Sequence, residues 1–200
     1  MFTGVIQGLG ILGGRRGGRR GGVLRVEVPP SVRERLKEGA SIAVSGVCLT
    51  ARELEGEAFL ADLSPETSSR TTLGELRTGA RLNLELPVSP DGLLDGHLVL
   101  GHVDTVGRVK AIRPDSDGWR LTFFYPPEWR RHLVEKGSIA VDGISLTPFS
   151  ITGTTFQCAI VPHTFEKTTL NERSVGDAVN LEFDILAKYV AEVTGRAHTD

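Results

Sequence analysis

The chain contains the same sequence pattern twice, 97 residues apart. Residues 41–50 (SIAVSGVCLT) return as residues 138–147 (SIAVDGISLT), with seven of the ten positions identical. The same offset pairs further residues along almost the whole chain: Gly4 with Gly101, Gly10 with Gly107, Leu36 with Leu133, Thr67 with Thr164, Leu73 with Leu170, and residues 83–85 (NLE) with residues 180–182 (NLE). A constant offset indicates two copies of one folding unit, and about 97 residues is a common size for a compact domain.

Alternating apolar and polar residues recur in both copies, and a period of two is typical of β-strands. The alternating segments are residues 23–28, 42–44, 81–86, 120–125 and 178–183. Because Gly, Pro and Asp-Gly turns separate these short segments, we predict an all-β chain of two sandwiches or barrels. One short helix is expected in each copy. The first is at residues 31–38, where Ser31 and Glu34 form a capping-box pattern, and the second is at residues 127–135.

The segment that follows the second copy has no counterpart after the first. The spacing of its apolar residues predicts a C-terminal α-helix with one apolar face, made of Ile185, Leu186, Tyr189, Val190 and Val193. Such a stripe either contacts another subunit or packs on the chain's own second unit. The sequence leaves both alternatives open.

The composition argues against several classes of protein. A net charge of −2 over 200 residues is not that of a protein whose main partner is nucleic acid. No apolar run approaches the roughly 20 residues that span a membrane, and the first residues do not form a signal peptide. The two cysteines, Cys48 and Cys158, pair by offset with Ser145 and Ala61, which gives neither a disulfide framework nor a metal-binding pattern. We therefore expect a reduced, cytoplasmic protein.

Two glycine-rich segments resemble binding motifs that we reject. Residues 8–13 (GLGILG) match the spacing of a dinucleotide-binding loop, but such a loop must lead into a helix. The residues that follow, 14–22 (GRRGGRRGG), cannot form a stable helix. Their four arginines are compatible with RNA binding. A flexible, solvated turn is the simpler interpretation, because the offset places them opposite a polar turn at residues 110–118.

Two short motifs occur in both copies and carry side chains suited to chemistry. In the first, Gly46 and Gly143 are each followed by an aliphatic residue, then Cys or Ser, then Leu and Thr. A turn explains the glycines but leaves the thiol or hydroxyl unexplained. The second motif is residues 65–67 (PET) with 71–73 (TTL), repeated as residues 162–164 (PHT) with 168–170 (TTL). Paired threonines suit recognition of a polar heterocycle or a polyol better than core packing.

Together these segments resemble riboflavin synthase of the α-chain type, a family built from two lumazine-binding repeats. The resemblance covers residues 1–195 and is carried by residues 1–6 (MFTGVI), both Gly-x-x-Leu-Thr strands, residues 96–104 (GHLVLGHVD) and residues 162–170 (PHTFEKTTL). It implies two tandem six-stranded Greek-key β-barrels, at residues 1–97 and 98–184. A C-terminal helix and tail, residues 185–200, would join three chains into a homotrimer. It further implies an active site between the N-terminal barrel of one subunit and the C-terminal barrel of its neighbour, with no metal and no organic cofactor.

The reaction that the resemblance implies is a dismutation of two identical substrates. Two molecules of 6,7-dimethyl-8-ribityllumazine exchange a four-carbon unit to give riboflavin and 5-amino-6-(ribitylamino)uracil. Because one molecule donates carbons and the other accepts them, the two copies must differ where the roles differ. Positions that break the repeat are therefore the better catalytic candidates.

His102, which the offset pairs with Val5, is our candidate for removing a proton from the C7 methyl group of one substrate. Imidazole suits that task because it titrates near neutral pH. In the resembled family Ser145 and Thr147 lie beside this histidine. The alternative is a histidine that makes only a structural hydrogen bond.

Cys48, which the offset pairs with Ser145, is our candidate for attack at C7 of the other substrate, assisted by Ser41. Asp184, which the offset pairs with Pro87, is a further catalytic candidate. The alternative for Cys48 is a small buried hydrophobic residue.

Matching the family's motifs residue by residue gives two expected substrate pockets. The pocket of the N-terminal barrel comprises Cys48, Leu49, Thr50, Asp62, Leu63, Ser64, Pro65, Glu66, Thr67, Gly101, His102 and Val103. The pocket of the C-terminal barrel comprises Gly4, Val5, Ile6, Lys136, Ser145, Leu146, Thr147, Ile160, Val161, Pro162, His163, Thr164 and Phe165. Phe2 is expected to lay its ring over a bound heterocycle. The competing hypothesis is a non-catalytic lumazine- or flavin-binding protein built on the same repeat.

Overall fold

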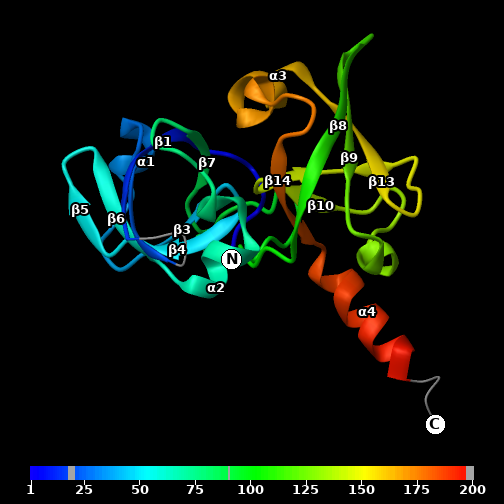
Figure 1. Cartoon of the computed structure of the whole chain (residues 1–200), viewed down its shortest axis with the longest axis horizontal. Helices are drawn as coiled ribbons and strands as arrows, with labels where there is room; N and C mark the ends of the chain where they lie inside the picture. The colour runs from blue at the N-terminus through cyan, green and yellow to red at the C-terminus, as the bar shows by residue number, and fades with distance from the viewer. Residues whose placement is uncertain (18–20, 90, 197–200) are drawn as a thin grey trace.

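Each copy of the repeat folds into one antiparallel β-sheet, and a helix extends from the end of the second (Figure 1). The computed structural model describes residues 1–17, 21–89 and 91–196. The first sheet contains β1 (Gly8–Arg16), β2 (Gly22–Glu27), β3 (Ser41–Val44), β4 (Val47–Thr50), β5 (Glu53–Glu55), β6 (Ala58–Leu63) and β7 (Arg81–Glu85). The second contains β8 (Thr105–Asp115), β9 (Gly118–Phe124), β10 (Ile139–Val141), β11 (Ile144–Leu146), β12 (Pro148–Phe149), β13 (Thr155–Ile160) and β14 (Ala178–Phe183). The helices are α1 (Pro30–Arg33), α2 (Pro65–Arg70), η1 (Thr72–Gly74), η2 (Pro127–His132), α3 (Pro162–Lys167), η3 (Thr169–Glu172) and α4 (Ile185–Arg196).

Each sheet curls back on itself, because its two end strands are consecutive pieces of chain. The strand order of the first sheet is β4-β3-β7-β1-β2-β6-β5, and only Ala51 and Arg52 separate the end strands β4 and β5. The N–H of Arg52 donates to the carbonyl of Leu60 on β6 at 2.8 Å, so the bent chain crosses from one end of the sheet to the other. The second sheet has the same order, β11-β10-β14-β8-β9-β13-β12. Each sheet has seven strands, or the expected six when the bent pair is counted once. The prediction of an all-β protein with two copies of one unit and a C-terminal helix is confirmed.

The first predicted helix is shorter than the sequence indicated. α1 begins after Pro29, no side chain caps it, and Glu34 already ends it. The expected capping box of Ser31 and Glu34 is therefore wrong, because Pro30, with its fixed φ, occupies the first helical position. The equivalent segment of the second copy forms the 3-10 helix η2.

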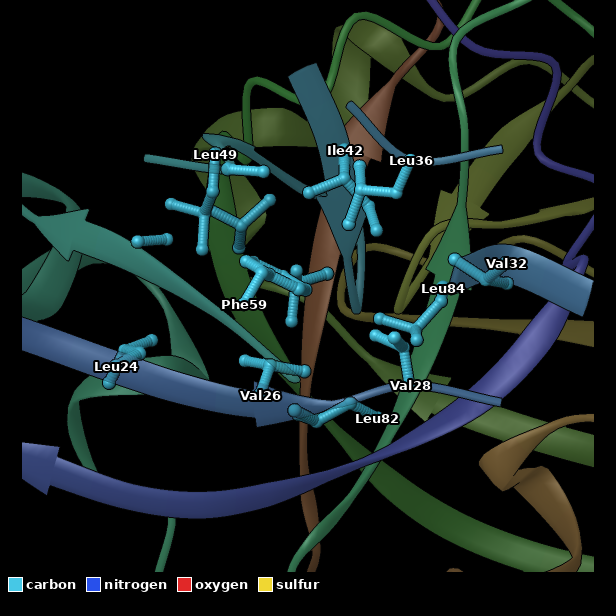
Figure 2. Close-up of a cluster of buried hydrophobic side chains, with 14 of the residues drawn as sticks. Leu24, Val26, Val28, Val32, Leu36, Ile42, Leu49, Phe59, Leu82 and Leu84 are labelled. Atoms are coloured by element: carbon cyan, nitrogen blue, oxygen red, sulfur yellow. The ribbon is translucent and has the colours of Figure 1, made fainter. Parts of the chain in front are cut away.

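Alternate residues of each sheet face inward and form two separate hydrophobic cores. In the first core, Leu24 and Val26 pack with Phe59 and with Leu82 and Leu84, which come from three different strands (Figure 2). These side chains are almost fully buried, and burying each one contributes about 1.5–3 kcal/mol of hydrophobic free energy. The second core is more aromatic and includes Phe123, Tyr125, Phe156 and Phe183. Because each copy has a hydrophobic core of its own, the prediction that the repeat consists of two folding units is confirmed.

Equivalent hydrogen bonds, made by the same residue type in each copy, hold the two copies together. Asn83 on β7 donates from Nδ2 to the carbonyl of Asp142 at 3.0 Å and accepts the N–H of Thr169 at 2.9 Å. Asn180 on β14 makes the two equivalent bonds, both at 2.8 Å. All four bonds are buried, so these asparagines belong to the contact between the copies.

The repeated threonines divide into two groups. Thr72 and Thr169 are buried at the contact between the two copies, where their N–H groups bond to the asparagines. Thr67 and Thr71 line the cavity of the first copy instead, and their equivalents Thr164 and Thr168 line that of the second. Ligand recognition is therefore expected only of the second group.

The turns after β3 and β10 meet at Gly46 and Gly143, whose φ angles are +78° and +80°. A Cβ on Gly46 would lie 2.6 Å from the backbone nitrogen of Gly143. The structure confirms that these glycines turn the chain. It adds the close approach of two backbones as a second requirement for glycine.

We expect Gly46→Ala to lower the free energy of unfolding by roughly 1–3 kcal/mol, because alanine is strained at positive φ and its Cβ has no space here. Urea unfolding measures the loss. Gly39→Ala is a matched control, because Gly39 has the same φ of +78° with no atom within 4 Å of the added Cβ. Equal losses in the two variants would show that the contact between the turns contributes nothing.

α4 stands away from the second sheet (Figure 1). It exposes apolar side chains. Leu186, Tyr189, Val190 and Val193 are each more than 60% exposed, so these four residues of the predicted stripe do not pack on the chain's own second unit. Ile185, at the start of the helix, is half-buried. Residues 197–200 of the expected tail and residues 18–20 of the arginine-rich turn lie outside the described residues. Within the described part of the chain, no helix is long and apolar enough to cross a membrane.

Candidate active site

The first cavity lies on the N-terminal copy and has a volume of about 350 Å³. β4 contributes Cys48, α2 contributes Thr67, and the segment before β8 contributes His102. A hollow of about 280 Å³ continues from Cys48 and Thr67 toward Asp62 and Thr50. The structure thus brings a thiol, an imidazole, a carboxylate and hydroxyl groups to one place.

A second cavity of about 250 Å³ occupies the equivalent place on the C-terminal copy. Ser145 on β11 replaces Cys48, and Val5 replaces His102. Thr164 on α3 is retained as the equivalent of Thr67. The two cavities therefore share one design but present different reactive groups.

Each cavity is closed by a segment from the other copy. The N–H of Cys48 donates to the carbonyl of Gly101 at 2.8 Å, and the N–H of Ser145 donates to the carbonyl of Gly4 at 2.9 Å. Both glycines have φ of +80°, and an added Cβ would lie 2.5 Å from the Cβ of Cys48 or 2.6 Å from that of Ser145. The repeated glycines therefore allow a backbone segment to approach the reactive residue closely.

A buried glutamate fixes each of these segments. Glu85 accepts the N–H groups of Thr3 at 2.6 Å and Gly4 at 3.0 Å. Glu182 accepts the equivalent two N–H groups before His102, at 2.6 and 2.9 Å. Burial raises the pKa of both carboxyl groups, and the bonds from the backbone N–H groups oppose this rise.

Cys48 lies between the first cavity and a small apolar cluster where the two copies meet. It packs against buried side chains from both copies, namely Phe2, Ala43, Val99 and Ala140. Phe2 is fully buried, so in this structure its ring backs Cys48 instead of covering an open cavity. Cys158 is buried in the second core, where burial raises the pKa of its thiol. Of the two cysteines, Cys48 is the one that reaches a cavity.

His97 also belongs to the site, although the repeat gave no indication of it. Its Nδ1 lies 2.7 Å from Oγ of Ser145, the side chain is 6% exposed, and Nε2 has no hydrogen-bond partner. Burial lowers the pKa of His97, and the charge of Asp184 opposes this. His97 is therefore a neutral imidazole beside the Ser145 hydroxyl. A signal for it exists in residues 96–104, which contain two Gly-His pairs.

The lowered pKa of His97 predicts a loss of stability in mild acid. The unfolded chain takes up a proton at this group near pH 6.5, whereas the folded chain resists it, so the free energy of unfolding falls as the pH drops below that value. We expect urea titrations at about pH 7.5 and pH 5.5 to show this loss, and His97→Gln to reduce it. His132 contributes in the same direction, because burial lowers its pKa as well, so each single variant is compared with the unmodified protein. If the free energy of unfolding of His97→Gln depended on pH as in the unmodified protein, His97 would not be the source of the loss.

The structure brings some of the expected site residues to the cavities and leaves others elsewhere. Those that line the two cavities or the adjoining hollow are Gly4, Val5, Ile6, Cys48, Leu49, Thr50, Asp62, Ser64, Glu66, Thr67, Gly101, His102, Val103, Ser145, His163 and Thr164. Those that do not are Phe2, Ser41, Leu63, Pro65, Lys136, Leu146, Thr147, Ile160, Val161, Pro162, Phe165 and Asp184.

The residues outside the cavities lie there for identifiable reasons. Leu63, Leu146 and Ile160 face the cores. They were expected at a pocket because every residue of each motif was included, whereas neighbouring residues of a strand face opposite ways. Asp184 lines a separate cavity beside α4. Lys136 is exposed, with its ammonium group 5.6 Å from the centre of a phenyl ring.

Two cations at equivalent positions were missed from the sequence. Arg70 lines the first cavity and Lys167 lines the second. The offset of 97 pairs them, so the repeat itself carried the signal. Among the described residues, no group of three or more His, Cys, Asp or Glu side chains is arranged to hold a metal ion.

Comparison with known proteins agrees with this architecture. The lumazine binding domain family matches residues 3–87 and 100–184, so the chain is a tandem lumazine-binding-domain protein. Riboflavin synthase of Mycobacterium tuberculosis (strain H37Rv) is 43% identical over 95% of this chain and 96% of that protein. Those of Actinobacillus pleuropneumoniae (36% identical, 96% and 89% covered) and Bacillus subtilis (35% identical, 99% and 92% covered) are also similar. The chain belongs to the riboflavin synthase family and is an enzyme.

The fold is also that of a solved ligand-binding protein. The crystal structure of LumP complexed with 6,7-dimethyl-8-(1'-D-ribityl) lumazine superposes with a TM-score of 0.83 and covers 92% of this chain and 99% of LumP. The two sequences are 22% identical. This similarity shows that the two proteins share a fold.

Proposed function

We propose that this enzyme converts two molecules of 6,7-dimethyl-8-ribityllumazine into riboflavin and 5-amino-6-(ribitylamino)uracil by transfer of a four-carbon unit. The observation that carries the proposal is the pair of cavities with one design and different reactive groups. Cys48 and His102 line the first cavity, and Ser145 with its neighbour His97 forms the equivalent place in the second. Two identical substrates need two similar pockets, whereas their opposite roles need different side chains.

The gain from such an arrangement is entropic. Two substrates that are held face to face react as if in one molecule, and good alignment lowers the barrier by up to about 7–11 kcal/mol. Arg70 and Lys167 place one positive charge at each cavity, where they suit a heterocycle that becomes anionic during the reaction.

His102 is the proposed base for the C7 methyl proton of one substrate, because its imidazole is exposed at the first cavity. Cys48 is the proposed nucleophile for C7 of the other substrate. Ser41 lies on β3 two residues from Ala43, which pairs with Cys48, so we assign it a supporting role. The neutral His97 is suited to exchange a proton with the Ser145 hydroxyl.

We further propose that the active site forms between chains of a homotrimer. Within one chain the two cavities share no lining residue, which supports a meeting of the two substrates across subunits. The exposed stripe of α4 supplies a contact surface, and a groove of about 650 Å³ beside α4 can receive apolar side chains of a neighbour. Thr147 and Asp184 would contribute to catalysis through this assembled site, and the buried Phe2 would support Cys48 from behind.

We assign residues 1–97 to the N-terminal domain and residues 98–184 to the C-terminal domain, with residues 185–200 as the segment for assembly. The free Cys48 and Cys158 support a reducing, cytoplasmic location.

Incubation of the purified protein with the dimethyl-ribityllumazine alone tests the function. Riboflavin absorbance should appear without any added cofactor. Tight binding of the lumazine with no turnover would instead support the non-catalytic binding protein.

The two cysteines offer a matched pair of variants. We expect Cys48→Ala to lower kcat by at least about tenfold, because it removes a thiol at the first cavity. Cys158→Ala should retain activity, because this side chain is buried in the second core and lines neither cavity. Steady-state turnover measures both, and equal effects on kcat would contradict the chemical role of Cys48.

A further inference from the structure

A shielded ion pair joins α4 to the segment that carries His102. Nζ of Lys188 lies 2.7 Å from Oδ1 and 2.6 Å from Oδ2 of Asp104, and the two side chains are only 22% and 13% exposed. Oδ2 of Asp104 also accepts the N–H of Phe183 at 2.8 Å. Because both carboxylate oxygens are engaged and largely hidden from water, this pair fixes Asp104 more firmly than a surface ion pair would.

The other end of the same segment is held by Glu182. Its carboxylate accepts the N–H groups of Leu100 and Gly101 at 2.6 and 2.9 Å. His102 lies between these two anchors, one residue after Gly101 and two before Asp104. Burial raises the pKa of Glu182, and the bond from Leu100 and the charge of Lys188 oppose this rise. The ammonium group of α4 therefore acts on both carboxylates that hold the segment.

Among its described residues, the first copy has no such anchor. Gln7 occupies the position equivalent to Asp104, and its Oε1 accepts from Arg35 at 3.3 Å on the exposed surface. β7 ends at Glu85, and no helix follows it in the described residues 86–89 and 91–104. Of the two equivalent segments, the one with the imidazole is the one that is tied to a helix.

We propose that Lys188 is a positioning residue that transmits the placement of α4 to His102 through Asp104. The inference rests on the proposed roles of α4 in assembly and of His102 in proton removal. When neighbouring chains cover the exposed stripe of α4, Lys188 is held in place and with it the segment at the first cavity. In a separate chain α4 moves more freely and the anchor loosens, so His102 is held in its catalytic position only in the assembled protein.

The test compares Lys188→Met, Lys188→Arg and Asp104→Asn in the full-length protein. Methionine keeps much of the length of the lysine stem without its charge, arginine keeps the charge, and asparagine keeps an acceptor for Phe183. We expect Lys188→Met and Asp104→Asn each to lower kcat by about tenfold or more, because small displacements of a catalytic group have large effects on rate. The mass should stay near the unmodified value in both variants, and the Kd for the lumazine should stay near it in Lys188→Met. Asp104 itself lines the first cavity, so a constant Kd is expected of the lysine variant alone. Lys188→Arg should restore most of the rate, and the double variant should be no slower than either single one.

Lys110→Met is the control, because Lys110 is exposed on β8 and lines neither cavity. An unchanged kcat in Lys188→Met would overturn the inference. So would a loss of the assembled mass in Lys188→Met, which would make Lys188 an assembly residue.

A readout without turnover separates this inference from the proposed reaction. In protein with isotope-labelled histidine, NMR should show a shift of the His102 ring signals in Lys188→Met, while those of His163 stay in place. If the unmodified protein fails to make riboflavin, the reaction is wrong but this shift still supports the inference. Unmoved His102 signals would overturn the positioning role whatever the activity.

Discussion

Glutamine in place of His102 should slow riboflavin formation by about 10²–10⁴-fold, which is the usual contribution of a positioned acid or base. The amide keeps polarity and approximate size but cannot take up the proton of the C7 methyl group. His102 lines the first cavity from an exposed position, so the loss should appear in kcat. Single-turnover absorbance measurements separate this step from product release.

Folding provides the control for His102→Gln. An exposed side chain contributes little to stability, so the free energy of unfolding should stay within about 0.5 kcal/mol of the unmodified value. The Kd for the lumazine should change little as well. Full activity in the folded variant would remove His102 as the base and leave His97 and His163, at the second cavity, as the imidazoles to test.

Removal of residues 186–200 should abolish turnover and reduce the mass seen by light scattering from three chains to one. The deletion takes away the exposed stripe of α4, whereas the residues that line the two cavities all precede residue 186. Each separate chain should therefore still bind the lumazine, while two bound molecules could no longer meet. Val190→Glu tests the same surface by a single charge and keeps Lys188, so it separates assembly from the ion pair with Asp104.

Two results would contradict this account of α4. An unchanged mass after the deletion would show that α4 does not join the chains. A fully active monomer would show that the two substrates do not meet between subunits.

The repeat in the sequence predicted much of the fold. Alternating segments marked most strands, and the paired glycines marked turns and close approaches of the backbone. Gly4 and Gly101 are an example, because their offset of 97 reflects equivalent contacts with Ser145 and Cys48. Such features depend on neighbouring residues or on the repeat, so a single sequence is enough to predict them.

What the sequence did not predict depends on long-range contacts without a repeat. The offset of 97 gives His97 no equivalent residue in the other copy. His97 contacts Ser145, which lies 48 residues further along the chain. The pair of Asp104 and Lys188 spans 84 residues and exists only in the second copy. Phe2 was expected over a ligand, but a terminal aromatic ring can equally be buried between two units, as it is here.

The exchange of segments between the two copies has a consequence for how the chain could have arisen. One copy alone could close its cavity only by lending its first residues to a second identical molecule, with Gly4 of each against residue 48 of the other. The present polypeptide has the arrangement of such a pair joined end to end. In a pair of separate identical chains every substitution appears twice, so residues 48 and 145 would have to match. In one joined chain they need not match, and here one is a thiol and the other a hydroxyl.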